Sequence, residues 1–206
     1  MKMLVMLTIS ALVLSGCATL SKDECLTANW YQIGYEDGAE GYPDTRIKSH
    51  REACAEYGIK PNFNDFQKGH GEGVITFCTP RNGFNKGKRN TKYQGVCPVD
   101  LETNFLEAYN NGRQIHAANT AVRDAKSAQR RNKQEQESLQ QGILDKKAIM
   151  FAAGTTTETR YALDAEVTQM QRSLNSLEIQ KRQLNNDVIR TERKLSELES
   201  EFAFSY

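Results

Sequence analysis

Apolar side chains recur at alternating spacings of four and three residues from Leu163 almost to the end of the chain. This spacing places them along one stripe of a helix and is typical of a coiled-coil seam. Two polar residues, Lys181 and Thr191, share the register. The apolar members are Leu163, Val167, Met170, Leu174, Leu177, Leu184, Val188, Leu195, Leu198 and Phe202.

The same register continues backwards on the other side of the stretch 154–159, which is rich in threonine. If the chain bends at 154–159, antiparallel packing pairs the two stripes and sets Lys181 opposite Asn132. The bend would also return the aromatic C-terminus, Phe202 to Tyr206, to the neighbourhood of Asn111. The second stripe consists of Met150, Lys146, Ile143, Leu139, Gln136, Asn132, Gln129, Ala125, Val122, Ala118 and Ile115.

Local signals favour a hairpin at this bend over a flexible linker. Gly154 suits the position just after a helix, and Thr155 with Glu158 has the spacing of a capping box that starts the next helix. The stretch 126–138 contains no large apolar residue, so the middle of the hairpin should be weakly packed and wet. A parallel dimer through the same seam is the alternative, although the flanking charges specify it poorly.

Composition changes near residue 112. Residues 25–112, here called the head, hold eleven of the 14 glycines and all 4 prolines. Residues 113–206 are rich in Gln, Glu, Lys, Arg and Leu. The expected fold is therefore mainly α, with a small disulfide-stapled, Gly/aromatic-rich helical head before a long antiparallel helical hairpin.

An aromatic residue repeatedly stands three positions before a glycine in the head. Glycines spaced along a helix leave a bare stripe that a neighbouring element can approach closely. We expect packing notches in short helices, filled by the aromatic rings. The alternative is a ring-lined face formed by Trp30, Tyr31 and Tyr35 that binds a glycan or peptide. Examples are Tyr31/Gly34, Phe66/Gly69, Phe84/Gly87 and Tyr109/Gly112.

The N-terminus carries a targeting signal. Lys2 precedes the apolar run 3–14, which is too short to span a bilayer as a mature helix. The run ends in Leu14-Ser15-Gly16-Cys17, which resembles the bacterial lipobox. The resemblance implies a signal peptide over 1–16, acyl chains such as palmitate on Cys17, and a short tether over 17–24. Ala18 favours the outer membrane, with the protein on its periplasmic face.

Four cysteines remain after lipidation of Cys17, namely Cys25, Cys54, Cys78 and Cys97. An even number in an oxidising compartment predicts two disulfides, for which three pairings exist. We favour Cys25–Cys54 and Cys78–Cys97, because each staples a local segment. A zinc site is the alternative, but no C-x2-C pair is present.

The head also resembles a known family in three places: WYQIGYEDGAEG at 30–41, FCTP at 77–80, and YQGVCP at 93–98. It is similar to an uncharacterised family of proteobacterial envelope lipoproteins, domain of unknown function 2799. The resemblance covers about the first 115 residues and implies an envelope lipoprotein. It carries no catalytic residue over to this chain.

No catalytic motif was found. The histidines are dispersed, and Asp65, His70 and Glu72 in the GHGEG stretch form the only acid/base candidate, although a glycine turn is the preferred interpretation. The chain has 27 Lys and Arg against 26 Asp and Glu, a balance that gives no argument for nucleic acid binding. We expect no enzyme activity, no cofactor and no metal.

The expected function is a structural or protein-interaction role at the outer membrane. The lipid anchor would hold the head near the membrane, and the coiled-coil arm would contact another envelope protein or peptidoglycan. The alternative is a glycan- or peptide-binding module that uses Trp30, Tyr31 and Tyr35. The protein would be a monomer or a coiled-coil homo-oligomer.

Overall fold

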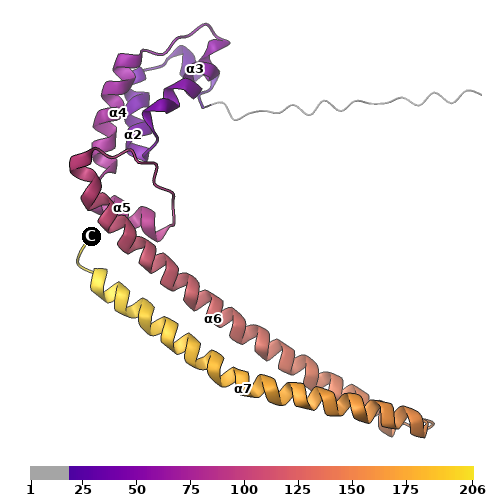
Figure 1. Ribbon diagram of the computed structural model, residues 1–206. Coiled ribbons are helices and arrows are strands. Elements are labelled where there is room, and N and C mark those ends of the chain that lie inside the picture. Colours follow the sequence, from indigo (N-terminus) through magenta and orange to yellow (C-terminus); the bar gives the residue numbers. More distant parts are fainter. Residues whose placement is uncertain (1–18) are drawn as a thin grey trace, which may run out of the picture. The chain divides into compact units, whose positions relative to one another are not determined.

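The computed structural model describes residues 19–206, and this part of the chain is mainly α-helical, without a strand (Figure 1). It divides into two compact units. The first unit holds the chain up to Thr79 together with Lys92–Phe105, and the second holds Pro80–Thr91 and Leu106–Tyr206. The elements are α1 (Lys22–Leu26), α2 (Trp30–Glu40), the 3-10 helix η1 (Asp44–Arg46), α3 (Ile47–Ala55), α4 (Phe63–Phe77), α5 (Pro80–Lys88), α6 (Val99–Phe151) and α7 (Thr157–Phe202).

Helices α2 and α4 pack closely because glycines on each face the backbone of the other. A Cβ built on Gly34 would lie 2.1 Å from the carbonyl oxygen of Phe66, and one on Gly69 would lie 1.9 Å from that of Tyr31. Gly38 and Gly73 repeat the arrangement one turn further on. The expectation that aromatic rings fill these notches was wrong, since backbone carbonyls fill them and the rings project elsewhere.

The core of the first unit forms around a disulfide. Cys25 and Cys54 are bonded, and the core cluster contains them together with Trp30, Ile47 and Phe66. Cys78 and Cys97 form the second disulfide, also within this unit. Both predicted pairings are confirmed. Each closes a short loop, which limits the freedom of the unfolded chain in a unit too small for a large core.

The second unit uses the same glycine contact between α5 and α6. A Cβ on Gly87 would lie 2.1 Å from the carbonyl oxygen of Tyr109, and one on Gly112 would lie 2.1 Å from that of Phe84. In both helix pairs, therefore, the aromatic residue of one helix presents its carbonyl to the glycine of the other. We call this reciprocal arrangement the glycine clasp.

The two clasps and the two disulfides share one sequence spacing. In each pair of helices, one aromatic residue stands six positions after the first cysteine of a disulfide, and the other stands twelve positions after the second cysteine. A glycine follows each aromatic residue three positions later. The chain therefore contains two copies of one pattern. The first copy is Cys25, Tyr31, Gly34, Cys54, Phe66 and Gly69, and the second is Cys78, Phe84, Gly87, Cys97, Tyr109 and Gly112.

Helices α6 and α7 run side by side as an antiparallel hairpin in the second unit (Figure 1). Every member of the predicted stripe on α6 is buried or half-buried, and so is every predicted member on α7 except Lys181. The hairpin and its register are confirmed. Lys181 is exposed and does not pair with Asn132, whose amide donates instead to the carbonyl of Leu177 (3.2 Å) and to Gln180 Oε1 (3.0 Å).

The bend lies at 152–156, earlier than the predicted 154–159. Helix α6 ends at Phe151, Gly154 has a φ of 86°, and α7 begins at Thr157. Glycine meets the positive φ without the steric cost that a Cβ brings. The helix cap is Thr156, whose hydroxyl accepts from the backbone N–H of Thr159 (3.2 Å). The predicted capping box of Thr155 and Glu158 was therefore wrong, because the cap lies one residue later and its third helical position is Thr159, not a glutamate.

The C-terminus is held where the hairpin predicts. Tyr206 stacks on Phe84 with ring centres 4.8 Å apart, and its hydroxyl accepts from the Asn111 side chain (2.8 Å). Phe202 packs edge-on against Phe84 as well.

The boundary that composition indicated at 112/113 lies inside α6. Composition changes there because the surroundings of the helix change along its length, although the helix itself continues.

Candidate functional site

The aromatic residues proposed as a binding face do not share one. Trp30 is 8% exposed and belongs to the core beside the Cys25–Cys54 disulfide. Tyr31 and Tyr35 remain half-buried on α2. The hydroxyl of Tyr31 donates to Glu72 of α4, and this bond raises the pKa of Tyr31. An open platform of three rings is therefore absent, because burial of the indole contributes to the core instead.

The three residues of the acid/base candidate in GHGEG also do not form one site. The preferred interpretation of this stretch as a glycine turn was wrong, since it lies within α4 and Gly69, Gly71 and Gly73 do not have positive φ. His70 Nε2 donates to the carbonyl of Tyr42 (2.7 Å), and Glu72 accepts from Tyr31. Asp65 accepts from Asn62 near the start of the helix (2.6 Å). The three side chains thus serve separate structural contacts.

The most buried polar cluster of the first unit was not predicted. His50 is 2% exposed, and its Nε2 donates to Oδ2 of the buried Asp37 (2.8 Å). Its Nδ1 is hydrogen-bonded to the hydroxyl of Thr19 (2.9 Å). Arg46 Nε lies 3.1 Å from the other oxygen of Asp37, and its guanidinium covers the ring of Tyr42. The cluster fastens Thr19, at the start of the described chain, to α2 and α3.

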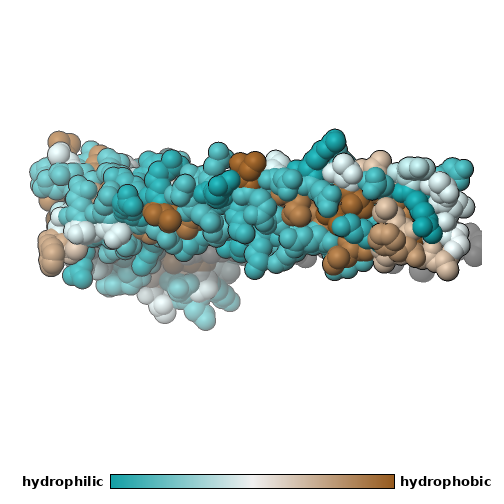
Figure 2. Space-filling view, turned by 90° about the horizontal axis from the view of Figure 1, so that it is seen from below, coloured by the Kyte–Doolittle hydropathy of each residue, from teal (hydrophilic) through white to brown (hydrophobic). Residues whose placement is uncertain are grey.

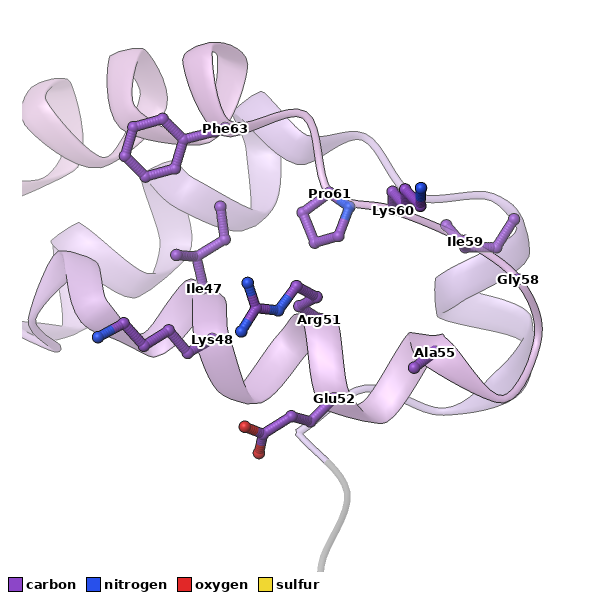
Figure 3. Close-up of a pocket in the computed structure, with 10 residues that line it drawn as sticks. All are labelled: Ile47, Lys48, Arg51, Glu52, Ala55, Gly58, Ile59, Lys60, Pro61 and Phe63. Atoms are coloured by element: carbon purple, nitrogen blue, oxygen red, sulfur yellow. The ribbon is translucent and has the colours of Figure 1, made fainter.

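A groove of about 650 Å³ runs between α3 and the segment 58–63. Figure 3 shows Arg51 extending from α3 between Ile47 and Pro61, with Phe63 across the opening and Lys48 at its edge. Glu52 points away from Pro61 and Phe63 in the same view. The groove thus combines an apolar lining with positive charge, and we call it the α3 groove. Its lining residues are Ile47, Lys48, Arg51, Glu52, Ala55, Gly58, Ile59, Lys60, Pro61 and Phe63.

The second unit exposes apolar side chains near the bend of the hairpin. Figure 2 shows hydrophobic residues gathered towards this end of α6 and α7, whereas hydrophilic residues dominate the middle. Leu144 and Phe151, one heptad apart on α6, are 61% and 78% exposed. Ile149 and Tyr161 are 52% and 75% exposed. We call Leu144, Phe151 and Tyr161 the bend surface; Ile149 is not part of it, because it lies about 140° around α6 from Leu144.

Their position makes the bend surface separate from the seam. The seam of α6 near the bend uses Ile143, Lys146 and Met150, all buried or half-buried. Leu144 and Phe151 lie outside that register, so packing against α7 does not account for them. An exposed apolar group of this kind is typical of an interaction site.

Cys17, the predicted lipidation site, lies outside the described residues, as do the signal peptide and the start of the tether. Within residues 19–206, no helix is long and apolar enough to cross a bilayer. The same residues contain no cluster of three His, Cys, Asp or Glu side chains arranged to hold a metal ion.

Residues 29–114 match the model of a family described as "Protein of unknown function (DUF2799)". The predicted resemblance to this family is thereby confirmed for the head. Comparison with curated proteins and with solved structures gave no significant match to the chain.

Proposed function

Because residues 29–114 match a family whose description names no activity, we propose a function from the chain's own surfaces. The protein is a lipid-anchored envelope protein that binds another envelope protein through the bend surface of its helical hairpin. The observation that carries this proposal is the exposure of Phe151 and Tyr161, by 78% and 75%, beside an intact seam.

The energetics favour a partner at this surface. Fully burying a Leu or Phe side chain contributes about 1.5–3 kcal/mol, so a partner that covers Leu144 and Phe151 gains about 3–6 kcal/mol before the costs of association. Leu144 and Phe151 repeat at seven residues, the spacing with which a helix docks into an apolar groove. The partner surface should therefore be an apolar groove or a helix pair.

The location of the partner follows from the anchor. Leu14-Ser15-Gly16-Cys17 supports lipidation at Cys17, and Ala18 supports the outer membrane. Several acyl chains on one residue give stable anchoring, because each buried methylene contributes about 0.8 kcal/mol. The two disulfides of the first unit agree with an oxidising compartment such as the periplasm.

Site-directed photo-crosslinking in cells tests the interaction. A photo-reactive amino acid at Phe151 should give a discrete product with another protein, whereas one at the exposed Gln134 in the middle of α6 should give none. Tyr161→Ser should reduce the Phe151 product while leaving the melting temperature unchanged, because Tyr161 is 75% exposed. Equal products from both positions, or a product containing only this chain, would overturn the proposal.

The anchor has its own test. Mass spectrometry of the mature protein should find an acylated N-terminal cysteine, and Cys17→Ser should abolish both the acylation and the membrane fractionation. Recovery of an unmodified chain that still begins upstream of Cys17 would refute the anchoring part of the proposal.

A further inference from the structure

We propose that the α3 groove binds an anionic phospholipid of the membrane to which the chain is anchored. This inference rests on the proposed anchoring at Cys17 and extends it, because it assigns a lipid ligand to the folded first unit. It concerns a surface distinct from the bend surface, so it makes no use of the protein partner.

The first step is the reach of the chain. Cys17 precedes Thr19 by two residues, and an extended chain spans at most about 3.6 Å per residue, so the two lie within about 7 Å of each other. Thr19 is bonded to His50 in the middle of α3 (2.9 Å), and Leu20 packs against the core of the unit. A lipid on Cys17 would therefore keep α3 beside the headgroup layer, which is itself several ångströms thick.

The second step is the chemistry of the groove. Lys48, Arg51 and Lys60 are exposed cations of the lining, with Arg51 extending between Ile47 and Pro61 and Lys48 at the edge, whereas Glu52, the one acidic residue of the lining, points away from its apolar side (Figure 3). Cations placed this way attract a phosphate, and a basic residue near an anionic bilayer strengthens binding about fivefold.

The apolar side of the groove suits the rest of a phospholipid. Phe63 is 51% exposed, and Ile59 and Pro61 continue the same apolar lining. Aromatic side chains favour the boundary between headgroups and acyl chains. A volume of about 650 Å³ accommodates a glycerophosphate headgroup with the first methylenes of a chain.

An acidic peptide is the competing ligand. It would have to be captured from solution, whereas the anchor holds membrane lipid beside the groove at a high effective concentration. In addition, the part of the chain that the structure describes has no strand edge to which an extended peptide could add. The observations thus favour the lipid.

The test uses the full chain purified from cells in a non-ionic detergent, with Phe63→Trp as a fluorescent probe. Titration with dihexanoylphosphatidylglycerol should give a saturable change, at least tenfold tighter than with dihexanoylphosphatidylcholine. Lys48→Gln and Arg51→Gln should each weaken binding about fivefold. The matched control is Lys147→Gln, an exposed lysine of α6, which should leave the affinity unchanged.

Several outcomes would overturn the proposal. Equal affinity for the two lipids, no effect of the two substitutions, or tighter binding of an oligoglutamate peptide would each do so. Equally tight binding of glycerol 3-phosphate would show a free-phosphate site instead of a lipid site. Each variant is first checked by circular dichroism, so that loss of fold is not mistaken for loss of binding.

Flotation with pure phosphatidylcholine vesicles separates this inference from the anchoring on which it rests. A chain that floats but shows no preference for phosphatidylglycerol retains its anchor, and only the groove assignment fails. A chain that does not float, yet binds dihexanoylphosphatidylglycerol in a Lys48-dependent manner, refutes the anchor and supports the lipid site of the groove.

Discussion

Replacing Gly69 by Ala should disrupt the packing of α2 on α4. The added Cβ would lie 1.9 Å from the carbonyl oxygen of Tyr31, whereas such contacts are essentially never shorter than 3.0 Å. The helices must therefore separate by about 1 Å, and a gap of that size already loses a quarter to a half of each dispersion contact along the interface. The obstacle is backbone, so no rotamer change relieves it.

Gly71 provides a matched control on the same helix. A Cβ there meets nothing within 4 Å, so Gly71→Ala should simply gain helix propensity, about 0.8–1.0 kcal/mol. Gly69→Ala gains the same propensity but should lose about 3 kcal/mol through overpacking, which leaves it destabilised by about 2 kcal/mol. The two variants should therefore differ by about 3 kcal/mol in the free energy of unfolding.

Urea unfolding followed by fluorescence measures this difference. The chain has one tryptophan, Trp30, and it lies in the core of the unit that contains α2 and α4, so the signal reports on the clasp itself. Equal urea midpoints for Gly69→Ala and Gly71→Ala at equal slopes would refute the reasoning, because they would mean that the helices tolerate the additional methyl group.

Three further predictions concern other contacts. Tyr206→Ala should lower the stability of the second unit by about 1–2 kcal/mol in thermal melts, since it removes both the stacking on Phe84 and a hydrogen bond. Asn132→Leu should cost about 1–3 kcal/mol, because the buried Gln136 amide loses its 2.6 Å partner and keeps only a long bond (3.4 Å) to the carbonyl of Leu177. The double change with Gln136→Leu should recover most of that loss in melts at 222 nm. Burial, and to a lesser extent the bond to a glutamate, raises the pKa of Tyr93. Its contribution to the free energy of unfolding is therefore present below about pH 10, the pKa of an unperturbed tyrosine, and is lost as the pH rises further. Tyr93→Phe should flatten this pH dependence of the urea midpoint.

The hairpin could be predicted from the sequence because its seam is a property of spacing alone. Ile143, Leu174 and Leu198 fall on the stripe whatever the details of packing, and the structure buries or half-buries each of them. Lys181 shows where this reasoning stops. Spacing assigns a position on a helix but not the direction of a long side chain, and a lysine at the seam can turn its ammonium to water while an amide bonds the backbone.

The candidate sites were harder to predict, because they depend on tertiary contacts. Nothing in the sequence signals that Asp37 and His50 meet, and the α3 groove exists only once the segment 58–63 crosses α3. Trp30 was misassigned because an aromatic residue suits a core and an open face equally well. Its position five residues after Cys25, which forms a core disulfide, was the signal that could have corrected the assignment.

The two copies of the Cys–aromatic–Gly pattern explain why the motif recurs at all. A clasp needs a glycine on each of two helices and a carbonyl three residues before each glycine, so the motif must occur in pairs. Both copies have the same spacings from each cysteine to the aromatic residue and the glycine, six and twelve positions to the aromatic residue and three more to the glycine, and each copy contains a disulfide and a clasp. In the second copy the later helix is α6, which continues past the clasp to build the hairpin. The hairpin is therefore an extension of a clasp helix and not a domain joined by a linker, and a substitution such as Gly112→Ala should loosen the base of the hairpin as well as the clasp.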